Sequence, residues 1–212
     1  MMRMQGEQRR LWVCHVFSLA IFLIGLTFPF LAAAVEGKPT DRVRDTLEDA
    51  LRVLDDPALQ GPEKKEARRQ EVRKLIAASF NYPEMAARSL DTYWVKLSDG
   101  QRQEFVDLFG ELFERSYSRL VLNSLPDQQI VYTGESLNGT KAVVKTILVD
   151  KRGDRLPVDY RLQRRNGRWK LFDVVIDGVS IVVNYQSQFN KIIRTSSYEA
   201  LVKKMRLKRD EE

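Results

Sequence analysis

Cysteine and histidine are almost absent from this chain. Each occurs once among 212 residues, as Cys14 and His15. Both lie in an N-terminal segment with the order of an export signal, so the chain beyond it has neither a thiol nor an imidazole. Their absence there excludes a cysteine or Ser-His nucleophile, a Cys or His metal site and thiol redox chemistry. We therefore expect no metal or cofactor, and a function based mainly on shape, apolar surface and carboxylate, amine or hydroxyl groups. We also expect that the protein is not an enzyme.

Long apolar runs are also scarce, and the one present lies near the N-terminus. Three arginines precede it, residues 11–31 form it, and alanines at 32–34 are the small residues that a signal peptidase recognises. We expect a cleaved signal peptide over residues 1–34 and one domain over residues 35–212. The run is long enough to span a bilayer, so a retained membrane anchor remains the alternative. Without disulfides, an ordinary apolar core must stabilise the exported domain.

Charge of one sign is not concentrated over most of the chain. The formal net charge is +6, from 35 Lys and Arg against 29 Asp and Glu. Only residues 203–209 form a basic run, which predicts a solvated helix end or a weak attraction to anionic partners or lipid head groups. No basic stripe with interleaved aromatic residues is present, so nucleic acid is not an expected partner.

The first half of the expected domain has helical periodicity. Thr40 is placed to cap a helix that ends before Pro57, and a second helix is expected to follow Pro62. A third is expected over about 83–97, and Ser98 with Gln101 has the capping-box pattern of a fourth. This fourth helix has a long apolar stripe at i, i+3, i+4 spacing: Phe105, Leu108, Phe109, Leu112, Phe113, Tyr117, Leu120 and Val121.

The second half is rich in β-branched and aromatic residues. Strands are expected near 128–134, 140–149, 155–164 and 167–176, with a tight hairpin at Asn166 and Gly167. In the last strand, strict alternation places Trp169, Leu171, Asp173 and Val175 on one face and Phe172, Val174 and Ile176 on the other. Two helices follow, over about 179–195 and 197–207. The fold class is therefore α+β, with a helical N-terminal half, a four-stranded antiparallel sheet and C-terminal helices around one core.

Several ordered segments resemble the MlaC family, also called the toluene-tolerance family. They are Asn-Gly-Arg-Trp-Lys-Leu-Phe-Asp at 166–173, Val-Val-Ile-Asp-Gly-Val-Ser at 174–180, Asn-Tyr-Gln-Ser-Gln-Phe at 184–189, Phe-Asn-Tyr-Pro-Glu-Met-Ala at 80–86, Tyr93-Trp94, Leu97-Ser98 with Gln101, and 105–117. The resemblance covers roughly residues 40–207. Asp91 stands where the family commonly has Gly, and Gln186 where it commonly has Arg, which leaves a specific ionic contact at that helix in doubt.

The resemblance implies a periplasmic phospholipid-binding protein with a curved, NTF2-like antiparallel sheet and an apolar cavity that takes up lipid tails. Its partners would be a phospholipid cargo, an inner-membrane ABC transporter with a membrane-tethered substrate-binding subunit, and an outer-membrane lipoprotein–porin complex. Such a system maintains the lipid asymmetry of the outer membrane. A hopanoid or sterol cargo would need nearly the same lining, so this variant stays open.

Candidate lining residues come from the apolar faces of the fourth helix, the last two strands and the helix after them. We expect lipid tails to contact Phe105, Phe109, Phe113, Tyr117, Leu156, Val158, Tyr160, Leu162, Trp169, Leu171, Ile181, Tyr185 and Phe189. Plain core packing is the alternative for each of them. Gly178 is expected only to allow a strand-to-helix turn, with Asp177 capping the helix.

Two other kinds of function remain open. An enzyme of the ketosteroid-isomerase type would need only Asp and Tyr, for which Asp159, Asp173, Tyr160 and Tyr185 are the candidates. Of these, Asp173 is the only carboxylate expected to be buried in a strand, where it would be catalytic or simply hydrogen-bonded. An envelope scaffold with a filled core and no ligand is the other alternative.

Overall fold

The structure is a computed structural model that describes residues 37–210. The signal peptide expected over residues 1–34 lies outside this range. The described part contains these helices: α1 (Pro39–Asp55), α2 (Lys65–Ser79), α3 (Tyr82–Leu90), α4 (Asp99–Ser124), α5 (Ile181–Thr195) and α6 (Tyr198–Asp210). Its strands are β1 (Gln129–Asn138), β2 (Lys141–Val149), β3 (Arg155–Arg165), β4 (Arg168–Ile176) and β5 (Val179–Ser180). The predicted α+β class is confirmed.

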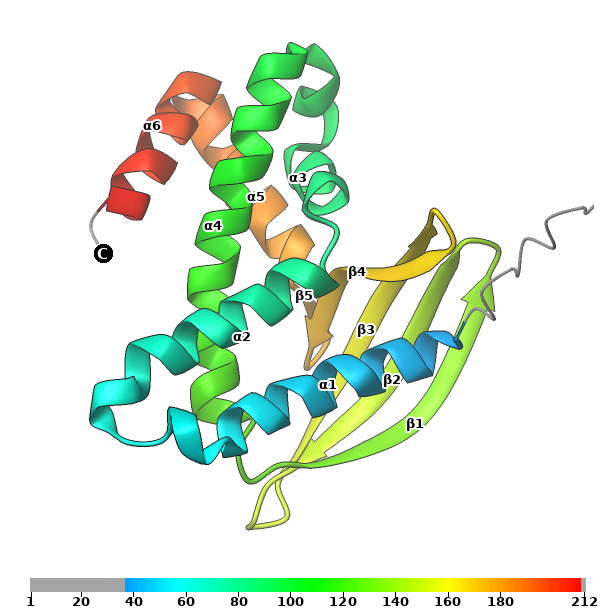
Figure 1. Ribbon diagram of the computed structural model, residues 1–212. Helices are drawn as coiled ribbons and strands as arrows, with labels where there is room; N and C mark the ends of the chain where they lie inside the picture. Colours follow the sequence, from blue (N-terminus) through cyan, green and yellow to red (C-terminus); the bar gives the residue numbers. More distant parts are fainter. Residues whose placement is uncertain (1–36, 211–212) are drawn as a thin grey trace, which may run out of the picture. The chain divides into compact units, whose positions relative to one another are not determined.

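All strand pairs are antiparallel, and the strand order is the chain order, β1-β2-β3-β4-β5. The two-residue β5 was not predicted from the sequence. The hairpin between β3 and β4 turns at Asn166 and Gly167, whose φ values are 48° and 77°. Two consecutive positive φ values are typical of the tight turn that an Asn-Gly pair favours. The α1 helix lies across one face of the sheet, as Figure 1 shows.

Helix boundaries follow local chemistry. At the start of α4, Ser98 Oγ accepts a hydrogen bond from the Gln101 backbone N–H (3.3 Å), and the Gln101 side chain accepts one from the Ser98 N–H (2.9 Å). The predicted capping box is therefore confirmed. The α1 helix begins at Pro39 with Lys38 as its N-cap, so the cap predicted at Thr40 is wrong. Proline suits the first helical position because its missing N–H is not needed there.

The third predicted helix is interrupted. The α3 helix ends at Leu90, and a 3-10 helix (Asp91–Lys96) follows it. Asp91 has a φ of 50°, a backbone conformation that glycine takes without strain and other residues adopt rarely. The resemblance to the MlaC family implies glycine at this position, which agrees with the conformation that Asp91 adopts here.

The β4 strand does not keep strict alternation. Phe172 is an additional residue without a partner on β3, because the register between the two strands shifts at this point. Such a β-bulge moves the following residues to the other face. Leu171 and Val174 therefore lie on one face of the sheet, and Asp173 lies on the other. The predicted grouping of Leu171 with Asp173 is wrong for this reason.

Candidate functional site

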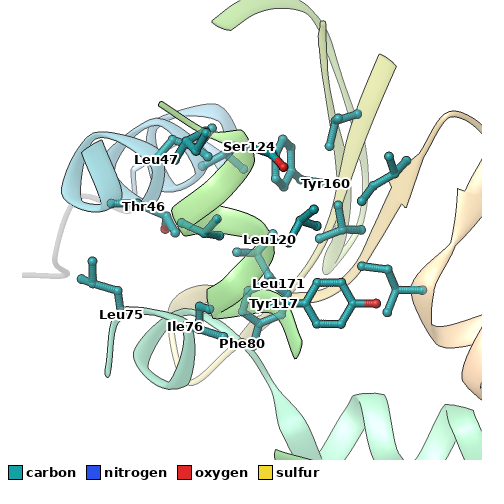
Figure 2. A pocket seen from close by; sticks show the side chains of 18 of the residues that line it. Thr46, Leu47, Leu75, Ile76, Phe80, Tyr117, Leu120, Ser124, Tyr160 and Leu171 are labelled. Carbon is teal, nitrogen blue, oxygen red and sulfur yellow. The ribbon is translucent and has the colours of Figure 1, made fainter. Parts of the chain in front are cut away.

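A cavity of about 220 Å³ lies between α1, α2, α4 and one face of the sheet. Figure 2 shows side chains from the helices and from the strands converging on the same space. The lining consists of Val43, Thr46, Leu47, Ala50, Val72, Leu75, Ile76, Phe80, Phe113, Tyr117, Leu120, Val121, Ser124, Leu125, Leu148, Leu156, Val158, Tyr160, Leu171, Val174, Ile176 and Ile181. No residue of this set is charged, and its only polar side-chain groups are four hydroxyls.

The sheet wall is built by residues that share a face through their pairing. Tyr160 of β3 lies opposite Val174 of β4, and Val158 lies opposite Ile176. Residues that pair directly across two strands project to the same side of the sheet. The bulge at Phe172 is what brings Val174 and Ile176 to this side together with Leu171.

The helix wall is shared by α1, α2 and the second half of α4. Phe113 is almost fully buried, and its ring contacts the rings of Tyr117 (4.4 Å between centroids) and Phe80 (4.9 Å). The first half of α4 packs against α5 instead. There Phe105 meets Phe189 edge-on at 5.7 Å, and Phe109 meets Tyr185 at 5.2 Å. One continuous apolar stripe therefore serves two purposes, with its N-terminal part filling the core and its C-terminal part facing the cavity.

The thirteen candidate lining residues are accordingly divided. Those that line the cavity are Phe113, Tyr117, Leu156, Val158, Tyr160, Leu171 and Ile181. Those that lie outside its lining are Phe105, Phe109, Leu162, Trp169, Tyr185 and Phe189. All of the second group except Tyr185 are buried in the main hydrophobic core, and Tyr185 packs against it.

The sequence reasoning missed the contribution of α1 and α2. Val43, Leu47 and Ala50 of α1 belong to the apolar face that the helical spacing predicts, but nothing in that spacing shows what the face covers. Val174 and Ile176 were missed because strict alternation assigned them to the wrong side of β4. The signal available for α1 is the helical spacing of its apolar residues, which requires some surface for them to pack against.

Two tyrosine hydroxyls belong to the lining. Burial raises the pKa of Tyr160 and of Tyr117, and for Tyr117 the nearby Tyr185 and Asp173 raise it further. Both phenols are therefore neutral at physiological pH, and they add no charge to the cavity.

The cavity reaches the surface beside two leucines. Leu120 of α4 and Leu156 of β3 both line the cavity, and they are 42% and 40% exposed. Large apolar side chains that are exposed at the edge of an apolar cavity mark an opening through which an apolar ligand can pass.

Asp173 is the buried carboxylate that the sequence singled out, with an exposed fraction of 2%. Its Oδ2 accepts hydrogen bonds from Arg161 Nη1 (3.0 Å) and Ser180 Oγ (2.6 Å), and its Oδ1 accepts one from the Val182 N–H (3.1 Å). It is not part of the cavity lining. The Asp173 side chain thus fixes the start of α5. Ser180 is the N-cap of that helix, so the cap predicted at Asp177 is wrong.

Two further properties concern the whole of residues 37–210. Within this range, no helix combines the length and the apolar character that crossing a bilayer requires. The same range has no group of three or more His, Cys, Asp or Glu side chains placed to hold a metal ion.

The family assignment follows from comparison with known proteins. The model of the MlaC protein family matches residues 44–207, which is most of the chain. The chain belongs to the MlaC family. The binding protein MlaC of the intermembrane phospholipid transport system of Haemophilus influenzae is 22% identical over 138 residues, 63% of this chain. The match spans 64% of that relative, slightly less than two thirds of its length.

A solved structure has the same fold as this chain. The phospholipid-binding protein of Ralstonia solanacearum, whose structure was determined in complex with a phospholipid, superposes with a TM-score of 0.70 at 20% sequence identity. The superposition covers 82% of this chain and 98% of that protein. The two chains therefore have the same fold.

Proposed function

We propose that this protein is a periplasmic phospholipid carrier that holds acyl tails in the cavity between α1, α2, α4 and the sheet. The main support is the chemistry of the cavity lining, which has four hydroxyls and no charged group. A polar group left without a hydrogen-bond partner would penalise the entry of a tail, and this lining has few such groups. The names of the relatives support the proposal, since one belongs to a phospholipid transport system and the other was solved with a phospholipid.

The physical task explains why a carrier is needed. Moving an acyl chain from a membrane into water costs about 0.8 kcal/mol per CH₂, so two chains of about sixteen carbons each give a barrier of roughly 25 kcal/mol. An apolar cavity removes most of this cost by replacing water with side chains. Spontaneous transfer across an aqueous compartment would be very slow without it.

Loading must widen the cavity. An engineered protein cavity of roughly 150 Å³ accepts a benzene molecule, and the cavity here measures about 220 Å³. Two long acyl chains contain several times more carbon than benzene. Loading with lipid therefore requires the helices and the sheet to move apart, and we expect the lipid-bound protein to have a larger cavity.

The finer assignment concerns the route. We propose that the carrier moves phospholipid between an outer-membrane lipoprotein–porin complex and an inner-membrane ABC transporter with a membrane-tethered substrate-binding subunit. This role would maintain the lipid asymmetry of the outer membrane. It is supported by the family, by the intermembrane system to which the Haemophilus relative belongs, and by the predicted export signal.

The test is to identify lipid in the purified protein. The protein is isolated from cells without detergent, extracted with organic solvent and analysed by mass spectrometry, and the same sample is offered fluorescent phospholipid. We expect about one phospholipid per chain, or uptake to that ratio. Recovery of a hopanoid or sterol would show that the cargo is not a phospholipid. Failure to bind any lipid in both assays would contradict the carrier function.

A cavity-filling variant makes the test specific. Ala50 is buried in the cavity lining, whereas Ala67 is exposed on α2. The substitution Ala50→Phe places a ring in the space that a tail would occupy and should abolish uptake. Ala67→Phe adds the same ring at the surface and should leave uptake unchanged. Equal uptake by the two variants would show that lipid binds elsewhere.

A further inference from the structure

A second, open pocket lies where the β3–β4 hairpin approaches the connection between α2 and α3, and it shares only Phe80 with the lining of the apolar cavity. It is lined by Phe80, Asn81, Tyr82, Pro83, Arg165, Asn166, Arg168 and Lys170. The two segments are held together by the backbone, because the Asn81 N–H donates to the Leu171 carbonyl at 2.7 Å. Three of the eight lining residues are cations and none is an anion.

Bringing these cations together destabilises the hairpin. Arg165 and Arg168 face each other directly across the hairpin, and like charges in a cross-strand pair destabilise a sheet. Among residues 37–210, neither arginine forms an ion pair with a carboxylate. The neighbouring Glu84 does not compensate them, since Arg88 holds it at 2.6 Å.

Lys170 adds to the same positive region. Its Nζ donates to the Ala78 carbonyl, beside Arg42, whose Nη2 lies 3.2 Å from Ser79 Oγ. Burial lowers the pKa of Lys170, and the charges of Arg42 and Arg168 lower it further. Arg42 and Arg168 therefore repel Lys170, just as Arg165 and Arg168 repel each other across the hairpin, and a bound anion would relieve this repulsion.

Asn81 supplies an independent indication of a ligand. Its exposed fraction is 7%, and its Oδ1 caps α3 by accepting a bond from the Glu84 N–H. The Nδ2 atom is buried and has no acceptor within the described part of the chain. A buried donor without an acceptor destabilises the fold, so its retention in a pocket wall points to an acceptor that the chain does not provide.

We propose that the pocket formed by Asn81, Arg165, Arg168 and Lys170 binds a phosphate-type oxyanion, either free phosphate or the phosphate of a lipid head group. Arginine presents paired N–H donors that match phosphate oxygens, and lysine adds a point charge. Phe80 lines both this pocket and the apolar cavity, so the two sites adjoin at this side chain. The inference does not depend on the carrier function, because the phosphate signal at Asn81 is followed separately from tail binding in the cavity.

The first experiment titrates the purified protein with inorganic phosphate and follows side-chain amide signals by NMR, with chloride at equal ionic strength as reference. We expect a saturable shift of the Asn81 Nδ2 signals. The variant R165Q/R168Q should weaken phosphate binding by about tenfold or more, since it removes two charge-assisted contacts. The variant K203Q/K204Q loses the same charge from the exposed side of α6 and should bind phosphate as the wild type does.

A second variant separates binding from folding. Asn81→Asp keeps an oxygen that can cap α3 but replaces the free donor with a charged acceptor, so it should lose phosphate binding while keeping its helix content and melting temperature. Phosphate affinity that is the same in the wild type, R165Q/R168Q and N81D would overturn the proposal.

The third experiment identifies the source of the phosphate. The protein is titrated with dihexanoyl-phosphatidylglycerol and with dihexanoylglycerol, which has the same tails and no phosphate. A shift of the Asn81 signals with the phospholipid, but not with free phosphate, assigns the pocket to the head group, whereas a shift with both assigns it to phosphate in general. No shift with either overturns the proposal. Signals of Tyr117 and Leu171 report tail binding separately, so failure of the carrier function is recognised independently.

Discussion

Arg161 of β3 and Asp173 of β4 lie opposite each other in the sheet and form an ion pair, with 3.0 Å between Nη1 and Oδ2. The pair is asymmetric, because the Asp173 side chain is 3% exposed and that of Arg161 is 41% exposed. The carboxylate also binds Ser180 and the Val182 N–H at the start of α5. One aspartate therefore joins the sheet to the helix that follows it.

Replacing this aspartate should destabilise the protein without unfolding it. Asp173→Asn keeps the size of the side chain but removes the charge from three hydrogen bonds, and we expect the free energy of unfolding to fall by about 2 kcal/mol. Urea denaturation followed by circular dichroism measures this change. The control is Asp154→Asn, whose ion pair with Arg152 is exposed and should contribute less than about 0.5 kcal/mol. Equal losses in the two variants would contradict the structural role of Asp173.

Phe113 and Phe105 offer a matched test of the cavity, because both are fully buried on α4 but only Phe113 lines the cavity. Each change to Ala should lower the free energy of unfolding by about 3–5 kcal/mol. Added phospholipid should restore more stability to Phe113→Ala than to Phe105→Ala, since a ligand that binds the native state stabilises it and only the first variant enlarges the binding space. Thermal unfolding with and without lipid provides the comparison, and equal recovery in both variants would contradict it.

The same two residues show how far sequence reasoning reaches. By spacing alone, Phe105 and Phe113 are equivalent members of one apolar stripe. Both are buried, whereas Leu120 of the same stripe is 42% exposed. Whether a buried ring faces another side chain or an empty space depends on the opposite wall. Phe189 of α5 fills the space beside Phe105, and no local pattern in α4 encodes that contact.

Local signals predicted local features well. The capping box at Ser98 and the turn at Asn166 and Gly167 depend on hydrogen bonds and φ values of a few neighbouring residues, and both are found as predicted. The bulge at Phe172 was not predictable in this way, because every residue around it is compatible with a regular strand. Its cause lies in the pairing with β3, and one additional residue changes which side chains reach the cavity.

Glu114 should make stability depend on pH. Burial raises the pKa of Glu114 above its ordinary value of 4.5, although Arg73, 3.4 Å away, opposes this effect. A carboxyl with a higher pKa in the folded state binds more protons there than in the unfolded chain. Its ionisation therefore destabilises the fold, and the free energy of unfolding should fall as pH rises from 4.5 through the folded-state pKa.

The substitution Glu114→Gln removes this titration. Urea denaturation at a series of pH values from 4.5 to neutrality should give a flatter dependence for Glu114→Gln than for the wild type, whatever the constant offset from losing the Arg73 contact. Glu66→Gln is the control, since the Glu66 side chain is 61% exposed. Parallel pH profiles for the wild type and Glu114→Gln would show that Glu114 does not titrate in this window.

At Gly110, replacement by alanine should destabilise the protein, although Gly→Ala usually stabilises a helix. A Cβ at Gly110 would lie 2.9 Å from Cδ2 of Tyr82 in α3. The Tyr82 ring also packs against Phe113, so α3 and α4 would have to move apart to make room for the added methyl group. We expect Gly110→Ala to lower the free energy of unfolding by about 1–3 kcal/mol through overpacking.

A Cβ at Gly100, in the same helix, would meet no other side chain within 4 Å. Gly100→Ala should therefore raise stability by about 0.5 kcal/mol, because alanine loses less backbone entropy on folding. Urea denaturation of the two variants provides the contrast, and stabilisation by Gly110→Ala would mean that α3 is free to move away from α4.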